Sequence, residues 1–214
     1  MTVWVPKGEF PHWEENIEQQ DSWRGNVLAF KTHIRQENVI HFENLYRYMY
    51  HYVTDEGWKH ADGSRHIEHF YGEKRDQENA KELRAWWRAE KQCGGIFGPH
   101  SFLKYKLYVD FLCYHLTRIE ITYGGKKIKP YVGDVNIWIT TVLEIDYNNW
   151  QEVSSLMGLF YEYFIRRIYK RNIRDHEVEL RRFAARFASD IKYFINMTRD
   201  SELRLPMHLE KQWF

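Results

Sequence analysis

Three histidines near residue 60 form the first group of side chains in this chain that could carry chemistry. His60, His66 and His69 lie within ten residues of one another. Histidine nitrogens and carboxylate oxygens bind zinc, so these residues together with Glu144 would suit a metal-dependent enzyme. On a strand, however, positions 66 and 69 point to opposite faces, so the two histidines would not converge. We therefore predict no metal site.

Two cysteines and two glycine-rich stretches could support covalent or phosphate chemistry. Cys93 and Cys113 would need a nearby base and a lowered thiol pKa to act as nucleophiles, and no surrounding pattern indicates either. Two cysteines do not make a disulfide framework, so we expect both to be reduced, with Cys113 in the core. The stretches GGIFG and YGGKK match no phosphate-binding motif. We predict no cofactor and no catalytic residue.

The strongest functional pattern is a group of cations at helical spacing in the C-terminal third. These cations are predicted to share one helix face beside Tyr163 and Tyr169: Arg166, Arg167, Lys170, Arg171 and Arg174. Such a face can bind nucleic-acid phosphates, an anionic membrane surface or an acidic partner. The alternative is an ordinary solvated face with ion pairs. A second basic group, Lys126 and Lys127, follows a Gly-Gly turn and should lie at a hairpin tip.

The stretch KELRAWWRAEK, residues 81–91, could be a strand or part of a helix. The preceding stretch, residues 65–75, also alternates, and a short polar segment joins the two. This pattern favours a β-hairpin. One helix over about 74–92 is the alternative, because Ala, Glu, Lys and Leu all favour helix.

The strand interpretation gives the two tryptophans of this stretch opposite environments. Trp87 would face the core, whereas Trp86 would stand on the outer face between Arg84 and Arg88. Aromatic rings interleaved with cations suit single-stranded nucleic acid, because bases stack on the rings. A helix would bury both tryptophans as packing.

The remaining periodicities predict an α+β fold. We expect an antiparallel meander of about five strands, covered by an N-terminal helix and a long C-terminal helical segment. The expected elements are a helix over 43–58, strands over 65–75, 81–91, 104–111, 118–123 and 134–147, and helix over 151–197, bent near Asn172 or divided in two.

Composition and the chain ends define the expected domain organisation. The chain has 214 residues, a net charge of +1 and 17% aromatic residues, many of them Tyr and Trp, which suit interfaces. We expect an extended aromatic arm over 1–25, a single domain over 26–200 and a short tail over 201–214. The arm carries four large aromatics that could dock on a partner or on the chain itself: Trp4, Phe10, Trp13 and Trp23. Without a signal peptide or apolar span in the sequence, we expect a cytoplasmic protein.

Several motifs together resemble a group of small archaeal proteins that have no assigned activity. They are KELRAWWRAEK, RIEITYGGKKIKPYVGDVNIWI and LEIDYNNW, followed by a basic terminal helix that contains RIYK. The similarity spans about residues 43–195 and rests on strand and turn patterns. The resemblance implies a hairpin over 66–91 and an archaeal or archaeal-virus source, and it implies no site residue.

The sequence therefore predicts a non-enzymatic interaction or structural protein, a component of a larger cellular or viral assembly with protein partners or self-association. The alternative is a nucleic-acid-binding accessory protein that uses the basic helix, the Lys126–Lys127 hairpin and the Trp86 surface. The metal-dependent enzyme is a third hypothesis.

Overall fold

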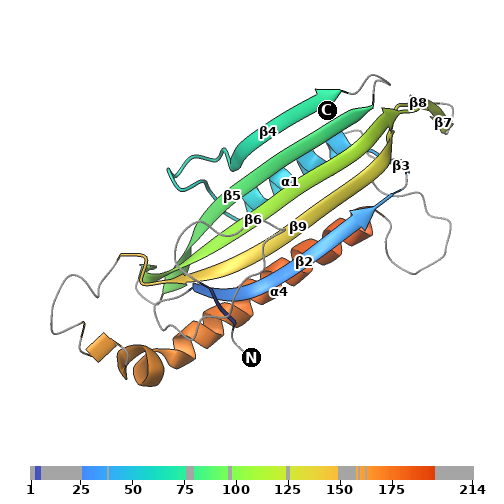
Figure 1. Cartoon of the computed structure of the whole chain (residues 1–214). Helices are drawn as coiled ribbons and strands as arrows, with labels where there is room; N and C mark the ends of the chain where they lie inside the picture. The colour runs from blue at the N-terminus through green and yellow to red at the C-terminus, as the bar shows by residue number, and fades with distance from the viewer. Residues whose placement is uncertain are drawn as a thin grey trace.

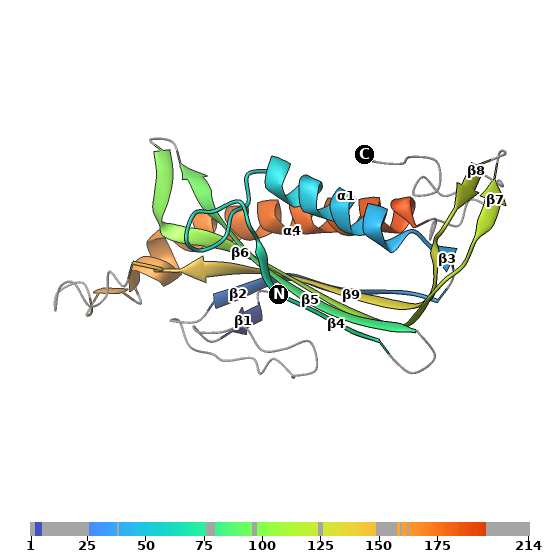
Figure 2. The same ribbon diagram turned by 90° about the horizontal axis from the view of Figure 1, so that it is seen from above.

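The computed structural model describes residues 3–5, 26–37, 39–75, 80–95, 98–123, 126–148, 158, 160–161 and 163–195. These residues form an α+β fold in which two helices cover one face of an antiparallel sheet (Figures 1 and 2). The expected fold class is confirmed. Among the described residues, no helix is both long enough and apolar enough to cross a membrane.

The main sheet has the strand order β1-β2-β9-β6-β5-β4, with β3 paired to one end of β9. All of its neighbouring strands are antiparallel. In chain order its strands are β1 (Val3–Val5), β2 (Asn26–Gln36), β3 (Val39–Ile40), β4 (Glu68–Arg75), β5 (Lys81–Gly95), β6 (Gly98–Arg118) and β9 (Tyr131–Ile145).

The β4–β5 hairpin confirms the strand interpretation of KELRAWWRAEK. Tyr71 pairs with Ala85, and Phe70 pairs with Trp86 on the outer face, the face opposite the helices. Trp87 is fully buried on the inner face, whereas Trp86 is only partly buried. The two adjacent tryptophans thus lie on opposite faces, as the period of two along a strand requires.

A bulge in β6 bends the far end of the sheet. The register between β6 and β9 shifts between Tyr114 and Thr117, and His115 takes a left-handed φ of 51°. Gly133 on β9 lies against this bulge, and a Cβ there would come within 2.7 Å of the Tyr114 carbonyl oxygen. Glycine is therefore required sterically at this close backbone approach.

Beyond the bulge, the chain forms a separate two-stranded ribbon. It consists of β7 (Ile121–Tyr123) and β8 (Lys126–Ile128), which pair antiparallel as the Gly-Gly turn predicted. The strand expected over 118–123 therefore lies outside the main sheet. The fifth long strand of the main sheet is instead β2. A bulge between Leu28 and Phe30 interrupts the alternation of this strand.

Helix α1 (Phe42–Asp55) confirms the helix expected over 43–58. It ends where Gly57 adopts a left-handed φ of 85°. The Gly57 N–H then donates to the Thr54 carbonyl at 3.0 Å and the Trp58 N–H to the Val53 carbonyl at 3.3 Å. This paired C-terminal cap satisfies two carbonyls that would otherwise lack partners, and it turns Trp58 into the core.

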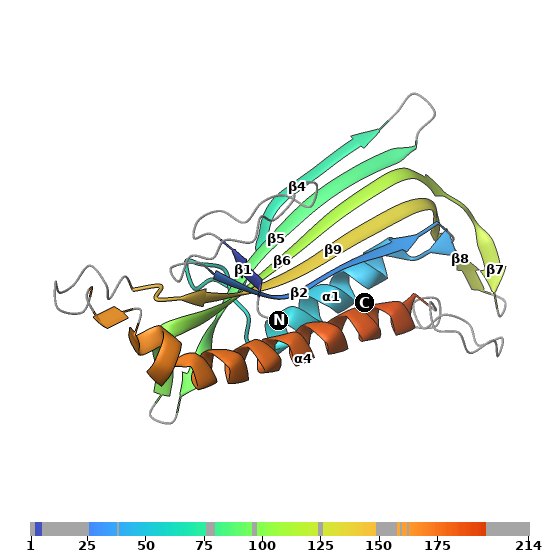
Figure 3. The same cartoon turned by 60° about the horizontal axis from the view of Figure 1, so that its bottom comes forward.

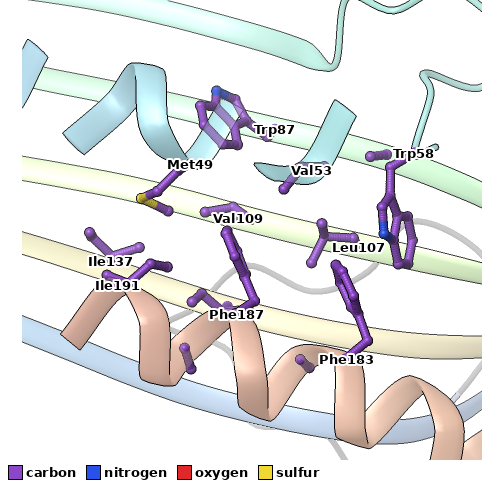
Figure 4. Close-up of a cluster of buried hydrophobic side chains, with 14 of the residues drawn as sticks. Met49, Val53, Trp58, Trp87, Leu107, Val109, Ile137, Phe183, Phe187 and Ile191 are labelled. Carbon is purple, nitrogen blue, oxygen red and sulfur yellow. The ribbon is translucent and has the colours of Figure 1, made fainter. Parts of the chain in front are cut away.

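Helix α4 (Lys170–Phe194) lies beside α1 on the inner face (Figure 3). Phe183, Phe187 and Ile191 point from α4 towards the sheet, and Met49 points towards it from α1 (Figure 4). Phe187 is completely buried. Burial of one such side chain contributes about 1.5–3 kcal/mol to folding, so this aromatic layer anchors the long helix to the sheet.

Candidate interaction surface

A π-helical turn, η1 (Phe164–Ile168), precedes α4. The irregularity therefore comes earlier than the bend predicted near Asn172, which lies inside α4. The Tyr169 N–H donates to the Phe164 carbonyl at 2.8 Å, five residues back, and the α-helical pattern resumes when Ile173 N–H donates to the Tyr169 carbonyl. A π turn inserts one extra residue into a helix and is often found at functional sites.

Aromatic packing fixes this turn to the end of the sheet. The ring of Phe102 on β6 lies 5.9 Å from the ring of Phe164 and 5.1 Å from that of Tyr169. Phe164 and Tyr169 also stack on each other at 5.3 Å. Tyr161 and Ile165 are buried beside them. The backbone that carries the side chains on the other faces of the turn is therefore held in a fixed position against the sheet.

The exposed side of this segment combines apolar and cationic side chains. Phe160, Tyr163 and Ile168 are 61%, 61% and 62% exposed. All five predicted cations are exposed as well. We call this group the basic helical end; it consists of Phe160, Tyr163, Arg166, Arg167, Ile168, Lys170, Arg171 and Arg174.

The exposure of these apolar residues departs from the pattern expected from the sequence. The sequence predicts Phe160, Tyr163, Phe164 and Ile168 as part of one apolar stripe at steps of three and four residues, yet the buried positions are Tyr161 and Ile165. A stripe predicted with uniform α-helical spacing changes phase across a π turn, because the turn adds a residue. The exposed aromatics of this surface were therefore missed, and only the cations were predicted.

The basic helical end carries a concentration of positive charge in the sequence. The stretch from Tyr163 to Arg174 contains five cations and no acidic residue. Arg171 lies 4.0 Å from Asp175, and both side chains are largely exposed. An exposed pair of this kind contributes about 0–1 kcal/mol.

The Trp86 surface has a different environment. Arg88 donates to Asp110 at 2.6 Å, and the Asp110 side chain is only 9% exposed. Arg84 pairs with Glu82 at 2.9 Å, and the ring of Trp86 packs on that of Phe70 at 4.6 Å. The predicted Arg-Trp-Arg row exists, and its two cations are neutralised within the sheet.

The Lys126–Lys127 hairpin is separate from the basic helical end. Lys127 pairs with Glu120 at 2.8 Å. The β7–β8 ribbon that carries the two lysines stands at the opposite end of the sheet from η1 and the start of α4 (Figures 1 and 3). The structure therefore does not bring the three predicted cationic groups together into one surface.

The aromatic arm is described only at its beginning. Trp4 lies in β1 and pairs with Val27 of β2, so this part of the arm joins the sheet of its own chain. The predicted docking residues Phe10, Trp13 and Trp23 lie outside the described residues.

The histidine cluster does not assemble a ligand set. The rings of His60 and His69 stack at 6.3 Å, and His66 precedes the first residue of β4. Glu144 pairs with Lys106 at 3.0 Å on the outer face. Within the part of the chain that the structure describes, no three His, Cys, Asp or Glu side chains are placed to hold a metal ion.

Both cysteines are free thiols in the core, as predicted. Burial raises the pKa of Cys93 to about 12. Burial also raises the pKa of Cys113 well above its usual range. Both thiols are therefore protonated at neutral pH, which disfavours nucleophilic attack.

Comparison with known proteins adds no family to this description. No family model matches the chain, and no curated protein matches it. The resemblance to small archaeal proteins stays a prediction.

Proposed function

We propose that this chain is a non-enzymatic interaction protein of the cytoplasm, a component of a larger assembly that docks through the basic helical end onto an acidic surface of a protein partner. The partner presents an acidic protein surface, which can belong to a second copy of the chain. The proposal rests on the exposure and charge of this one surface.

The observation that carries the proposal is the concentration of exposed apolar side chains next to a run of exposed cations that contains no acidic residue. Of the six large apolar side chains that are exposed among the described residues, three lie between Phe160 and Ile168. Exposed apolar residues scattered singly are ordinary, whereas a group of them marks an interaction site. Aromatic and arginine side chains are also the types enriched where proteins bind one another.

Helix electrostatics support the same surface. Lys170 and Arg171 begin α4, and its first turn contains no acidic residue. Lys170 and Arg174 are four residues apart in α4, and like charges at that spacing cost about 0.2–0.5 kcal/mol. An acidic partner would offset this cost on binding. A local arrangement that disfavours folding is typical of a functional site.

Charge reversal on one helix tests the proposal. The double variant R167E/R174E changes two exposed cations of the basic helical end, and R182E/K192E makes the same charge change at two exposed positions further along α4. Each variant and the wild type would be tagged, purified from the native source and sized by sedimentation. We expect the wild type and R182E/K192E to sediment as species larger than the 26.3 kDa chain, and R167E/R174E to sediment as the free chain.

Two results would count against this function. One is a wild-type chain that sediments as a monomer in native extracts at low salt. The other is a larger species that survives R167E/R174E unchanged.

Nucleic-acid binding is a second candidate, because the same five cations could neutralise phosphates. Salt dependence identifies it: binding of duplex DNA through five phosphate contacts should give a slope of log K against log salt of about −4.5. R167E/R174E should make this slope smaller by about 2. Failure to bind duplex or single-stranded oligonucleotides at low salt would exclude this candidate, as would a native complex that resists nuclease.

A further inference from the structure

A pocket of about 300 Å³ lies between the first turns of α1 and the sheet. Phe42, Glu43 and Tyr46 line it from the helix. Its other walls include Glu68 and Tyr71 of β4 and Tyr131 of β9. The pocket therefore combines four aromatic rings with two carboxylates. It is separate from the basic helical end, which lies beyond the other end of the sheet.

One wall of this pocket is held rigidly. The Trp87 indole N–H donates to the Tyr46 hydroxyl oxygen at 2.7 Å, and the Tyr46 hydroxyl donates in turn to Glu68. Burial and the Glu68 carboxylate raise the pKa of Tyr46 far above its usual range, so this hydroxyl keeps its proton. Tyr46 also packs edge-on against Trp87 at 4.8 Å. Because these contacts already hold the Tyr46 side chain in place, little conformational entropy is lost there when a ligand binds.

Each carboxylate in the pocket keeps one oxygen available. Glu43 uses Oε1 to accept from Arg118 at 3.0 Å and from the Tyr131 hydroxyl at 3.3 Å. Glu68 uses Oε2 to accept from Tyr46. No hydrogen bond to a described residue involves Glu43 Oε2 or Glu68 Oε1. These two oxygens can accept hydrogen bonds from donor groups on a ligand.

The cations near the pocket are already engaged with carboxylates. Lys81 pairs with Glu73, and Arg118 pairs with Glu43. Lys81 and Arg118 also lie 5.9 and 5.2 Å from the centre of the Tyr131 ring. This ring therefore already supports positive charge through cation–π contact. Because Arg47 also borders the pocket, an anionic ligand is the competing chemistry that a test must separate.

We propose that this pocket binds a small organic cation, an alkylammonium or guanidinium group, between its tyrosine rings and the free oxygens of Glu43 and Glu68. The group can come from a free amine or from a lysine or arginine side chain of a partner. Both sources present the same chemistry: donor hydrogens for the carboxylates and positive charge for the ring faces.

Calorimetric titration of the full-length chain with matched probes tests this proposal. n-Butylammonium, n-butyrate and 1-butanol have similar sizes and differ in charge. We expect butylammonium to bind at least about tenfold more tightly than butyrate or butanol, because only the cation gains the carboxylate and cation–π contacts. A capped lysine peptide that binds more tightly than butylammonium would identify a partner side chain as the source, and one that binds more weakly would identify a free amine.

Substitutions locate the binding. E68Q and E43Q keep the shape of the side chain and should each weaken butylammonium binding at least about fivefold, as should Tyr71→Leu through loss of a ring. E82Q on the outer face of the sheet is the matched control and should leave the affinity unchanged. Equal affinity for butyrate and butylammonium would overturn the proposal. So would unchanged affinity in both E68Q and E43Q, provided that circular dichroism shows both variants folded.

Discussion

The outer face of the sheet and the basic helical end are both rich in aromatic and cationic side chains, yet they differ in how closely carboxylates accompany the cations. On the sheet, Arg88 pairs with Asp110, and Lys106 pairs with Glu144. On the helical end, five cations stand with no acidic residue between Tyr163 and Arg174. The two surfaces have similar compositions and differ in the local arrangement of opposite charges.

The difference arises from the geometry of the two elements. A strand places each residue beside cross-strand neighbours on the same face, so a cation at Arg88 meets a residue 22 positions away. An exposed helical segment offers its side chains only neighbours three and four positions along its own chain. A run without acidic residues therefore gives its cations no carboxylate neighbour within the run itself. Cation counts identify an interaction surface only when cross-strand partners are known.

The largest effect should come from removing the anchor beneath the sheet surface. Trp87→Ala should lower the free energy of unfolding by about 3–5 kcal/mol, because the fully buried indole leaves a cavity. Trp86→Ala on the opposite face should cost only about 1 kcal/mol, because this ring is partly exposed. Urea denaturation followed by circular dichroism measures both values, and equal losses would contradict the assignment of opposite faces.

A smaller effect should follow from breaking the charge balance of the sheet. Arg88→Ala leaves the nearly buried Asp110 carboxylate without this partner and should cost about 3 kcal/mol. Arg84→Ala removes an exposed pair from the same strand and face, and it should cost about 0.5 kcal/mol or less. Similar losses for the two arginines would show that neutralisation of this face does not depend on the buried pair.

Alkaline pH should weaken the core that holds both surfaces in place. Burial raises the pKa of Cys93 from 9.0 to about 12, so the folded state holds this proton more tightly than the unfolded state. The stabilisation is complete below pH 9 and is lost as the pH rises towards 12. We expect the free energy of unfolding to fall over this range by about 1–3 kcal/mol from this thiol.

Cys93→Ala provides the control for this pH dependence. The variant should be less stable at neutral pH, but it should lose less stability than the wild type between pH 9 and 12. Some loss should remain in both proteins, because burial also raises the pKa of Tyr52 to about 12. Identical slopes for the variant and the wild type would contradict a thiol proton held by burial.

The smallest effect on stability is expected at the basic helical end. Arg171→Glu breaks the exposed pair with Asp175 and places two acidic side chains four residues apart, so it should lower the free energy of unfolding by no more than about 0.5 kcal/mol. Arg182→Glu, in the middle of the helix, should change stability by less than about 0.5 kcal/mol. Thermal unfolding at low salt compares the two variants. A clear loss of stability in Arg171→Glu would mean that this cation has a structural role.

Local patterns predicted much of the fold. Alternation in the stretches around Trp87 identified the β4–β5 hairpin, and the periodicity before Gly57 identified α1. Strand β2 was missed, because the bulge after Leu28 interrupts its alternation. The pairing of Arg88 with Asp110 depends on strand register, which the pattern of one strand does not contain.

The candidate site was predicted only in part. The five cations of the basic helical end follow from spacing in the sequence, but the exposure of Phe160 and Ile168 does not. It depends on the π turn, which no single residue between Phe164 and Ile168 signals. The pocket beside Tyr46 likewise joins residues from α1, β4 and β9, so no local motif could reveal it.

Site-specific photo-crosslinking tests the central claim most directly. A photoreactive phenylalanine analogue would replace Tyr163 in the basic helical end or Tyr193 near the end of α4; the two side chains are 61% and 57% exposed. In native cells, we expect a discrete adduct from position 163 that is lost in R167E/R174E. We expect no adduct from position 193. An adduct of twice 26.3 kDa would identify a second copy as the partner. Equal adducts from both positions, or an adduct from position 193 alone, would contradict docking through the basic helical end.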